Sequence, residues 1–189
     1  LKPAIDKAIA HLHKFAKENE FYYRTDSKNA RGPSMRCVGV LCLQLMGDGE
    51  SDTAKRIGAY IEKNDMQYLQ WKGEKGNSPL AFPLYFWYYG TQVMFQRGGK
   101  GWKAWNSKFQ KLLTANQHKE GYWESPSAFE ADRFNMPGID KQVYSTANCA
   151  LMLTVYYRYL PSFKVKVTKT AKKEKPKDDI DDIGLDLIE

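Results

Sequence analysis

The stretch PLYFWYYGTQVMFQ, residues 83–96, decides the fold of this chain. It is long enough for about four helical turns, and its apolar side chains would surround the helix instead of forming one stripe. A helix of this kind must be covered on more than one side. Residues 34–46, SMRCVGVLCLQLM, and residues 143–160, VYSTANCALMLTVYYRYL, have the same character. The sequence therefore predicts three inner helices.

Three segments of another kind alternate with these inner segments. Residues 3–19, 51–64 and 100–117 each place apolar side chains at helical spacing on one side and charged side chains on the other. Pro3 suits a first-turn position, and Ser51 is expected to cap the second of these helices. Such helices lie on the surface. The order outer, inner, outer, inner, outer, inner predicts an all-α fold of stacked αα-hairpins.

A weak internal repeat supports stacked hairpins. Three pairs of residues recur 51 or 52 positions apart: Gly39 and Gly90 within inner segments, Gly47 and Gly98 at their ends, and Trp71 and Trp123 after the next outer segments. Repeats of this length are typical of helical solenoids and toroids. Glycine inside a helix costs about 1 kcal/mol relative to alanine, so we expect neighbouring inner helices to approach closely there. Ala147 and Ala150 are expected to serve the last inner helix in the same way.

One motif after the third outer segment resembles a known family. Residues 109–123, FQKLLTANQHKEGYW, place Gln117, Gly121 and Trp123 in the pattern Q-x-x-x-G-x-W. This pattern resembles the QW repeat of the squalene cyclase and protein prenyltransferase superfamily. The amide of Gln117 can donate and accept at the helix end, Gly121 permits a turn, and Trp123 is expected to lie on the amide. The motif is therefore predicted to be a structural staple.

The resemblance is uneven along the chain. Residues 80–161 are similar to bacterial prenyltransferase/squalene-oxidase-repeat proteins, whereas residues 1–79 match through their helix pattern and Trp71, with Asp65 standing where the glutamine would be. The resemblance implies that residues 1–163 form part, about half, of an α/α toroid. Either missing sequence, a second half-toroid or a homo-oligomer completes the ring, or the chain forms an open arc.

Composition sets the last residues apart. The 189 residues are 42% hydrophobic with a net charge of +7, which fits one folded domain. Residues 164–177 hold seven lysines and one acid, and residues 178–189 hold six acids and no base, so residues 1–163 carry the whole +7. We predict a charged, low-complexity tail over residues 164–189 that does not fold alone. A second interpretation is an acidic–hydrophobic motif that docks in a groove.

The cysteines and the start of the chain leave the cellular compartment undecided. Cys37, Cys42 and Cys149 lack a metal-binding spacing and are predicted to be buried free thiols. We expect no signal peptide and no membrane span, because the longest apolar runs are about half the ~20 residues that a span needs. A chain that begins at Leu1 is expected to be a mature product or a piece of a longer protein.

Catalytic residues are not predicted in this chain. The resemblance implies a DxDD proton donor for a cyclase, and the nearest string, residues 178–182, lies in the polar tail. It implies a zinc held by Asp, Cys and His for a prenyltransferase, but His11, His13 and His118 are expected on the surface. The acids of the loop over residues 118–142 are expected to be solvated, although a pair of them could do acid–base work on a glycan. The acids singled out here are Glu124, Glu130, Asp132 and Asp140.

An aromatic inner surface remains as the candidate site. Most of its tyrosines and tryptophans are expected to pack between helix layers, while some face a concave surface. The predicted ligand-binding residues are Trp87, Tyr88, Tyr144 and Tyr157.

We therefore predict a domain without a cofactor or metal that binds an apolar or glycan ligand, or a protein partner, on its concave aromatic face. The alternative is an enzyme fragment, like a terpenoid cyclase or prenyltransferase, whose catalytic acids lie outside this chain. Nucleic-acid binding is disfavoured, because the lysines scatter over the outer helices without interleaved aromatics.

Overall fold

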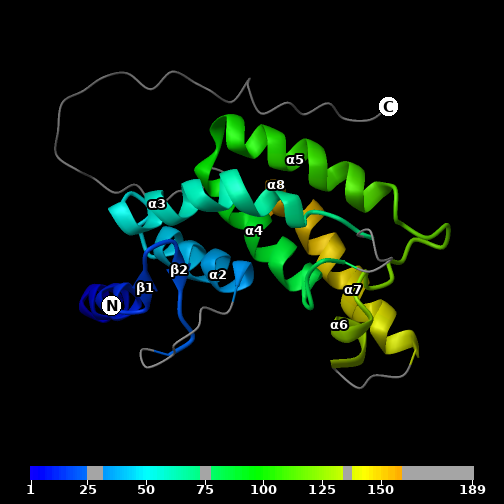
Figure 1. The fold of residues 1–189 in the computed structure, drawn as a ribbon, viewed down its shortest axis with the longest axis horizontal. Coiled ribbons are helices and arrows are strands. Elements are labelled where there is room, and N and C mark those ends of the chain that lie inside the picture. Colours follow the sequence, from blue (N-terminus) through cyan, green and yellow to red (C-terminus); the bar gives the residue numbers. More distant parts are fainter. Residues whose placement is uncertain (25–31, 73–77, 134–137, 159–189) are drawn as a thin grey trace.

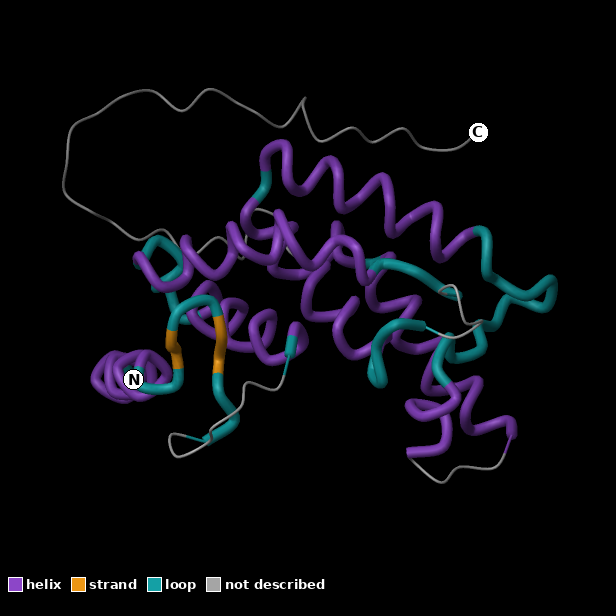
Figure 2. The backbone as a smooth tube through the Cα atoms, in the orientation of Figure 1, coloured by secondary structure: helices purple, strands orange, loops and turns teal. Residues whose placement is uncertain are grey.

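The computed structural model describes residues 1–24, 32–72, 78–133 and 138–158. These residues are mostly helical, with one short two-stranded sheet (Figure 1, Figure 2). The predicted all-α class is confirmed at this level. Within the same residues, no helix combines the length and the apolar character that crossing a bilayer requires. The predicted tail, residues 164–189, lies outside the described part of the chain.

Two helices form the centre of the fold. The helix α2 (Pro33–Leu45) packs against α4 (Pro83–Arg97), and α4 also contacts α7 (Gly138–Leu153) (Figure 1). Both α2 and α4 bury side chains around most of their circumference, as predicted for inner helices. Gly47, with a φ of 86°, follows the end of α2, and Gly98, with a φ of 65°, ends α4. Both positions suit glycine, because other residues rarely adopt a positive φ.

Two amphipathic helices cover the inner pair. The helix α3 (Asp52–Tyr60), continued by the π-helix η1 (Ile61–Asp65) and the short 3-10 helix η2 (Met66–Tyr68), packs on α2. The helix α5 (Gly99–Thr114) packs on α4 through buried Trp102, Trp105 and Phe109. The hydroxyl of Ser51 accepts a hydrogen bond from the N–H of Ala54 at 3.4 Å, so the predicted cap is confirmed.

The first helix is shorter than predicted. The helix α1 (Lys2–His13) ends well before residue 19, and the chain continues into the antiparallel strands β1 (Ala16–Lys17) and β2 (Glu20–Phe21). Glu18 has a φ of 50° in the turn between them. Phe21 is 2% exposed and lies on α2. Burial of this ring favours the hairpin over a longer helix, because the helix α1 itself buries no side chain.

The two central glycines are needed for a reason that differs from the prediction. A Cβ added at Gly39 would lie 2.3 Å from the ring of Phe21, and one added at Gly90 would lie 2.8 Å from the ring of Trp105. Each glycine therefore makes room for an aromatic ring from outside the inner layer. The expected reason, close approach of neighbouring inner helices, applies only in part: a Cβ at Gly90 would also meet Sγ of Cys37 on α2, but at 3.6 Å, an ordinary contact distance.

The last helices differ most from the prediction. A helix, α6 (Ala128–Arg133), lies within the expected loop, and α7 begins at Gly138 instead of residue 143. The helix α7 stops at Leu153, and a short helix, α8 (Val155–Arg158), follows it. Ala147 and Ala150 are exposed, so they do not serve close packing of inner helices within this chain.

A buried ion pair fastens α2 to the outer layer. Nε and Nη2 of Arg36 lie 2.9 Å and 2.7 Å from the two carboxylate oxygens of Asp65. Arg36 is 5% exposed and Asp65 is 1% exposed. Glu20 of the hairpin also pairs with Arg36, whose guanidinium lies 4.9 Å from the centre of the Tyr60 ring. Arg36 of α2, paired with Asp65 of η1 and Glu20 of β2, therefore holds these three elements together.

Candidate functional site

A buried carboxylate organises the start of α4. The two oxygens of Glu130 accept hydrogen bonds from the backbone N–H groups of Leu84 and Tyr85, each at 3.1 Å. These groups belong to the first turn of a helix, where no carbonyl of the same helix is available to them. Glu130 is 0% exposed, so it takes the place of water there. Its negative charge also suits the positive end of the α4 dipole.

Two hydroxyl groups complete the surroundings of Glu130. The hydroxyl of Tyr144 donates to it at 3.1 Å and that of Ser125 at 3.4 Å. Burial raises the pKa of Glu130, while the four hydrogen bonds oppose that shift. Burial, followed by the Glu130 charge, raises the pKa of the Tyr144 hydroxyl, which stays a donor at neutral pH. A carboxylate with four donors and no exposure is an anchor between α4, α6 and α7.

Hydrogen bonds between two loops bring Glu130 to α4. The hydroxyl of Ser127 donates to the carbonyl of Ala81 at 2.9 Å, and it accepts from the N–H of Glu130 at 3.3 Å. The N–H of Ser78 donates to the carbonyl of Pro126 at 3.1 Å. The segment before α4 and the segment before α6 are therefore tied together, which fixes α6 beside the first turn of α4.

An aromatic stripe begins at this first turn. Phe82, Tyr85 and Tyr89 follow the spacing i, i+3, i+7, which places them on one side of α4. Tyr85 is 38% exposed, and its ring centre lies 4.8 Å from that of Tyr89. Phe129 of α6 is 58% exposed and packs edge to face on Phe82 at 5.3 Å. We call Phe82, Tyr85, Tyr89 and Phe129 the α4 patch.

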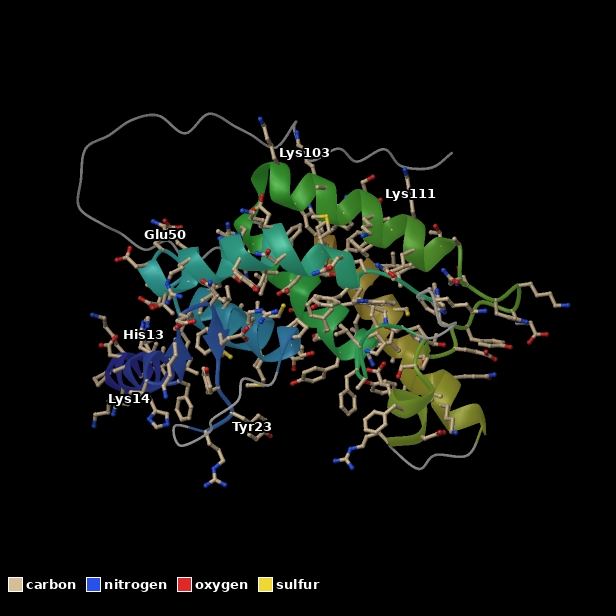
Figure 3. The ribbon with its side chains drawn as sticks, viewed as in Figure 1. His13, Lys14, Tyr23, Glu50, Lys103 and Lys111 are labelled. Atoms are coloured by element: carbon tan, nitrogen blue, oxygen red, sulfur yellow. The ribbon has the colours of Figure 1, made fainter. Side chains whose placement is uncertain are left out.

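The α4 patch is neutral and has a polar edge. The hydroxyls of Tyr85 and Tyr89 are hydrogen-bonded, and burial, followed by Tyr89, raises the pKa of Tyr85 to about 12. Tyr23 and Cys42 lie close enough to add smaller contributions to that pKa. Tyr23 is 66% exposed and lies just beyond β2 (Figure 3). Side chains from four parts of the chain therefore converge near the patch, and none of the four patch side chains is charged.

Two of the four predicted ligand-binding residues lie away from this patch. Trp87 is 1% exposed, and its indole N–H donates to the carbonyl of Tyr68 at 2.9 Å. Its ring packs against Trp71 at 5.5 Å, so both tryptophans are core residues. Tyr157 is 70% exposed on α8. The structure therefore does not bring the four predicted residues together.

The other two predicted residues lie beside the patch. Tyr88 is half-buried and packs edge to face on Tyr89, with ring centres 5.1 Å apart. Tyr144 is half-buried and binds Glu130. They support the patch from behind, and Tyr85 and Phe129 are the more exposed members.

The predicted QW residues close the loop after α5. The side-chain amide of Gln117 donates to the carbonyl of Gly121 at 2.9 Å, and Gly121 has a φ of 91°. Trp123 is 4% exposed, and its indole N–H donates to the carbonyl of Leu113 at 2.8 Å, near the end of α5. The indole thus adds a second donor to a carbonyl near the helix end that also accepts from the N–H of Asn116 at 3.1 Å, a contact that we did not predict.

Sequence reasoning missed the role of Glu130, which is buried instead of solvated as expected. A signal was present: Ser127-Ala-Phe-Glu130 has the S-x-x-E pattern that begins many helices. The hydroxyl of Ser127 accepts from the N–H of Glu130, as this pattern predicts. The side chain of Glu130 instead binds α4, and that contact depends on tertiary structure.

No metal or nucleophile site emerges from the described residues. Among them, no group of three or more His, Cys, Asp or Glu side chains is placed to hold a metal ion. The hydroxyl of Ser145 donates to the carbonyl of Lys141 in its own helix at 3.0 Å. Cys37 and Cys149 are buried as predicted, whereas Cys42 is only half-buried.

Comparisons with known proteins provide no relative. No protein-family model matches the chain, and no curated protein or solved structure matches it. The resemblance to squalene cyclases and prenyltransferases therefore stays a prediction, and the function must be argued from the geometry of the chain.

Proposed function

We propose that this chain is a binding domain that takes a carbohydrate ring on the α4 patch. The observation that carries the proposal is a tyrosine pair, Tyr85 exposed and Tyr89 half-buried, on a helix turn held by a buried carboxylate, with the exposed Phe129 packed on Phe82 at the start of the same helix. Aromatic rings offer flat apolar area to the C–H face of a sugar. Tyrosine adds a hydroxyl at the rim that can bond to a sugar hydroxyl.

The polar edge of the patch favours a sugar over a purely apolar ligand. An apolar ligand would bury the hydroxyls of Tyr85 and Tyr89 without offering them new partners, which costs free energy. A sugar offers donors and acceptors to both. The four side chains of the patch carry no charge, so the patch itself offers no ion pair to a charged ligand.

Pre-organisation supports binding over catalysis. Glu130 fixes the first turn of α4 through Leu84 and Tyr85, so the patch needs little ordering when a ligand arrives. The same hydrogen bonds occupy both carboxylate oxygens of Glu130, so Glu130 serves as an acceptor for α4 and not as a free acid. The enzyme alternative concerns acids outside this chain, and no described contact favours it.

The proposal is tested by titrating the full chain with soluble oligosaccharides in a calorimeter. The panel contains cello-, xylo-, manno- and chito-oligosaccharides, with the apolar dye anilinonaphthalene sulfonate as a separate arm. We expect one sugar class to bind, and Tyr85→Ala and Phe129→Ala to weaken it at least tenfold, about 1.4 kcal/mol. Tyr157→Ala, which removes an equally large ring from an exposed site on α8, is the matched control and should bind normally.

Three outcomes overturn the proposal. The first is that no sugar class binds. The second is that sugar binding survives both patch substitutions. The third is that the dye alone binds and is lost with Tyr85→Ala, which would assign the patch to an apolar ligand.

We also propose that the helices form one arc of an α/α toroid. Support comes from the series α2, α4 and α7 with α3 and α5 packed on its first two members. A second half, whether further sequence or another copy, would then close the ring.

A further inference from the structure

The helix α7 is covered on one side and apolar on the other. Ser145, Cys149 and Met152 are buried on the covered side. Side chains two positions apart on a helix point about 200° away from each other. Val143 and Ala147 come two positions before Ser145 and Cys149, so they lie on the opposite side of α7. The exposed residues on that side are Val143, Ala147, Ala150 and Leu151 of α7 and Tyr157 of α8. We call these five residues the α7 stripe.

The α7 stripe exposes large apolar side chains. Val143 is 63% exposed, Leu151 is 37% exposed and Tyr157 is 70% exposed. The N–H of Thr154 still bonds to the carbonyl of Ala150 at 3.0 Å, so the stripe runs on from α7 toward α8. A contiguous apolar surface of this kind on a water-exposed helix marks an interaction site more often than an ordinary surface.

The charge around the stripe indicates what kind of surface it fits. The helices α7 and α8 contain three charged residues, Asp140, Lys141 and Arg158, all of them near the two ends of the stripe, and the ammonium of Lys141 pairs with Asp132 at 2.5 Å. The stripe thus attracts neither a polyanion nor a polycation. The chain's own charged blocks, residues 164–177 and 178–189, are correspondingly poor matches. A second neutral apolar helix is the better fit.

We propose that the α7 stripe is the surface on which a second copy of this chain docks, with the two α7 helices antiparallel and crossing at Ala150. A two-fold axis at Ala150 places Val143 opposite Tyr157 of the partner subunit. The small side chains of Ala147 and Ala150 lie at the centre, where two helix axes come closest. Val143 and Tyr157 lie at the two ends and Leu151 lies beside the axis, so each end of the stripe faces the other end of the partner subunit's stripe, as a two-fold interface requires.

Docking in this way would also extend the inner layer of helices. Within one chain α4 is flanked by α2 and α7, whereas the described residues cover α7 on one side alone. The α7 helix of the partner subunit would cover the other side. The inference does not rest on the carbohydrate proposal, because the α7 stripe and the α4 patch share no residue.

Sedimentation equilibrium of the full chain over a range of concentrations tests the proposal. We expect a dimer of twice the 21.8 kDa chain mass. Val143→Glu and Ala147→Glu should raise the dimer dissociation constant at least a hundredfold. Tyr23→Glu introduces the same charge at a 66% exposed site away from the stripe and should leave the dissociation constant unchanged. Circular dichroism of each variant checks that the helices remain.

A cysteine cross-link tests the position of the two-fold axis. Ala150→Cys should form a disulfide-linked dimer when diamide is the oxidant, because the two thiols would meet at the axis. Ala115→Cys, at an exposed position after α5, should not.

Each contrary result overturns the proposal. If the wild-type chain stays monomeric at every concentration, no second copy docks on the stripe. If, in addition, Ala147→Glu lowers the melting temperature and Tyr23→Glu does not, the chain itself covers the stripe. A dimer that survives both glutamate substitutions places the interface elsewhere. All of these measurements are made without sugar, so their failure is separate from failure of the carbohydrate proposal.

Discussion

The helices α2 and α4 are both inner helices, but buried carboxylates hold them in different ways. Asp65 meets a full positive charge on Arg36, at 2.7 Å and 2.9 Å. Glu130 meets neutral donors, two backbone N–H groups of α4 and two hydroxyls. The first arrangement joins side chains across three elements, while the second completes the hydrogen bonding of a helix end. Both carboxylates are almost without exposure.

This difference predicts how much stability is lost when one partner of each buried carboxylate is removed. Removing one half of a buried ion pair leaves the other charge buried and unpaired, which is more costly than the pair is stabilising. Removing an acceptor from neutral donors leaves polar groups unsatisfied, at a smaller cost. We therefore expect a carboxylate-to-amide change to lower the stability more at Asp65, which holds α2, than at Glu130, which holds α4.

The largest effect is expected for Asp65→Asn. The amide cannot neutralise Arg36, and Glu20 alone remains as an acidic partner. The free energy of unfolding in urea should fall by about 3–5 kcal/mol. Glu50→Gln, a matched change at an exposed carboxylate that pairs with Lys55, should change it by less than about 1 kcal/mol.

A double variant sharpens this expectation. Replacing both partners by apolar residues of similar volume, Arg36→Met with Asp65→Leu, removes the unpaired charge and should recover most of the lost stability. If Asp65→Asn costs no more than Glu50→Gln, the ion pair is not what fastens α2.

The inner helices themselves were predictable from the sequence. The apolar character of residues 34–46 and 83–96 on every side is visible without any structure, and so are Ser51 as a cap and Gly98 as a helix end. Local chemistry decides these features. What covers each helix is decided by residues far away in the sequence, and for that reason Phe21 over Gly39 and Trp105 over Gly90 were missed.

The sequence predicts only part of the candidate site, because residues far away in the sequence decide which side chains are covered. The concentration of aromatics in α4 was visible, but which of them face solvent depends on the rotation of the helix. Trp87 was chosen and is buried, whereas Tyr85, two positions earlier, is exposed. Glu130 was expected to be solvated, because nothing local shows that the first turn of α4 lies beside it.

The second prediction compares the glycines of the two helices. Gly39→Ala and Gly90→Ala should each lower the free energy of unfolding by about 1–3 kcal/mol, because an aromatic ring must move. We expect Gly90→Ala to cost more. The indole N–H of Trp105 is held by the hydroxyl of Thr91 at 3.0 Å, whereas Phe21 lies on a two-residue strand that can shift.

Urea unfolding measures both effects, and a double variant checks their cause. Adding Trp105→Phe to Gly90→Ala makes room for the new methyl group, so the two costs should not add. Full additivity, or an alanine that stabilises either helix, would contradict crowding by the rings.

The third prediction concerns Glu130→Gln. Its amide nitrogen puts a donor where the N–H of Leu84 or Tyr85 needs an acceptor, so stability at neutral pH should fall by about 1–3 kcal/mol. Glu130 also gives this change a pH dependence. The pKa of Glu130 is raised above 4.5 in the folded chain. As the pH rises, Glu130 therefore loses its proton at a lower pH in the unfolded state than in the folded state.

The sign of that pH dependence follows directly. The contribution of Glu130 to stability is largest below pH 4.5 and declines as the pH rises through the raised pKa. The difference in unfolding free energy between wild type and Glu130→Gln should therefore shrink from pH 4 toward neutral pH. A difference that grows over this range would show that the four donors lower the pKa more than burial raises it.

The smallest effect is expected for Tyr144→Phe, which separates anchoring from ligand binding. It removes one of the four donors to Glu130, at 3.1 Å, and keeps the ring. The free energy of unfolding should fall by about 1 kcal/mol. The pKa of Glu130 should rise further, because the hydrogen bond from Tyr144 lowers it in the native chain. Tyr23→Phe removes a hydroxyl from a side chain that is 66% exposed and lies outside the α7 stripe, so it should leave stability unchanged. If the two variants are equally stable, Tyr144 does not hold α7 to the Glu130 anchor. The predicted role of Tyr144 in ligand binding would then be the better explanation of its position.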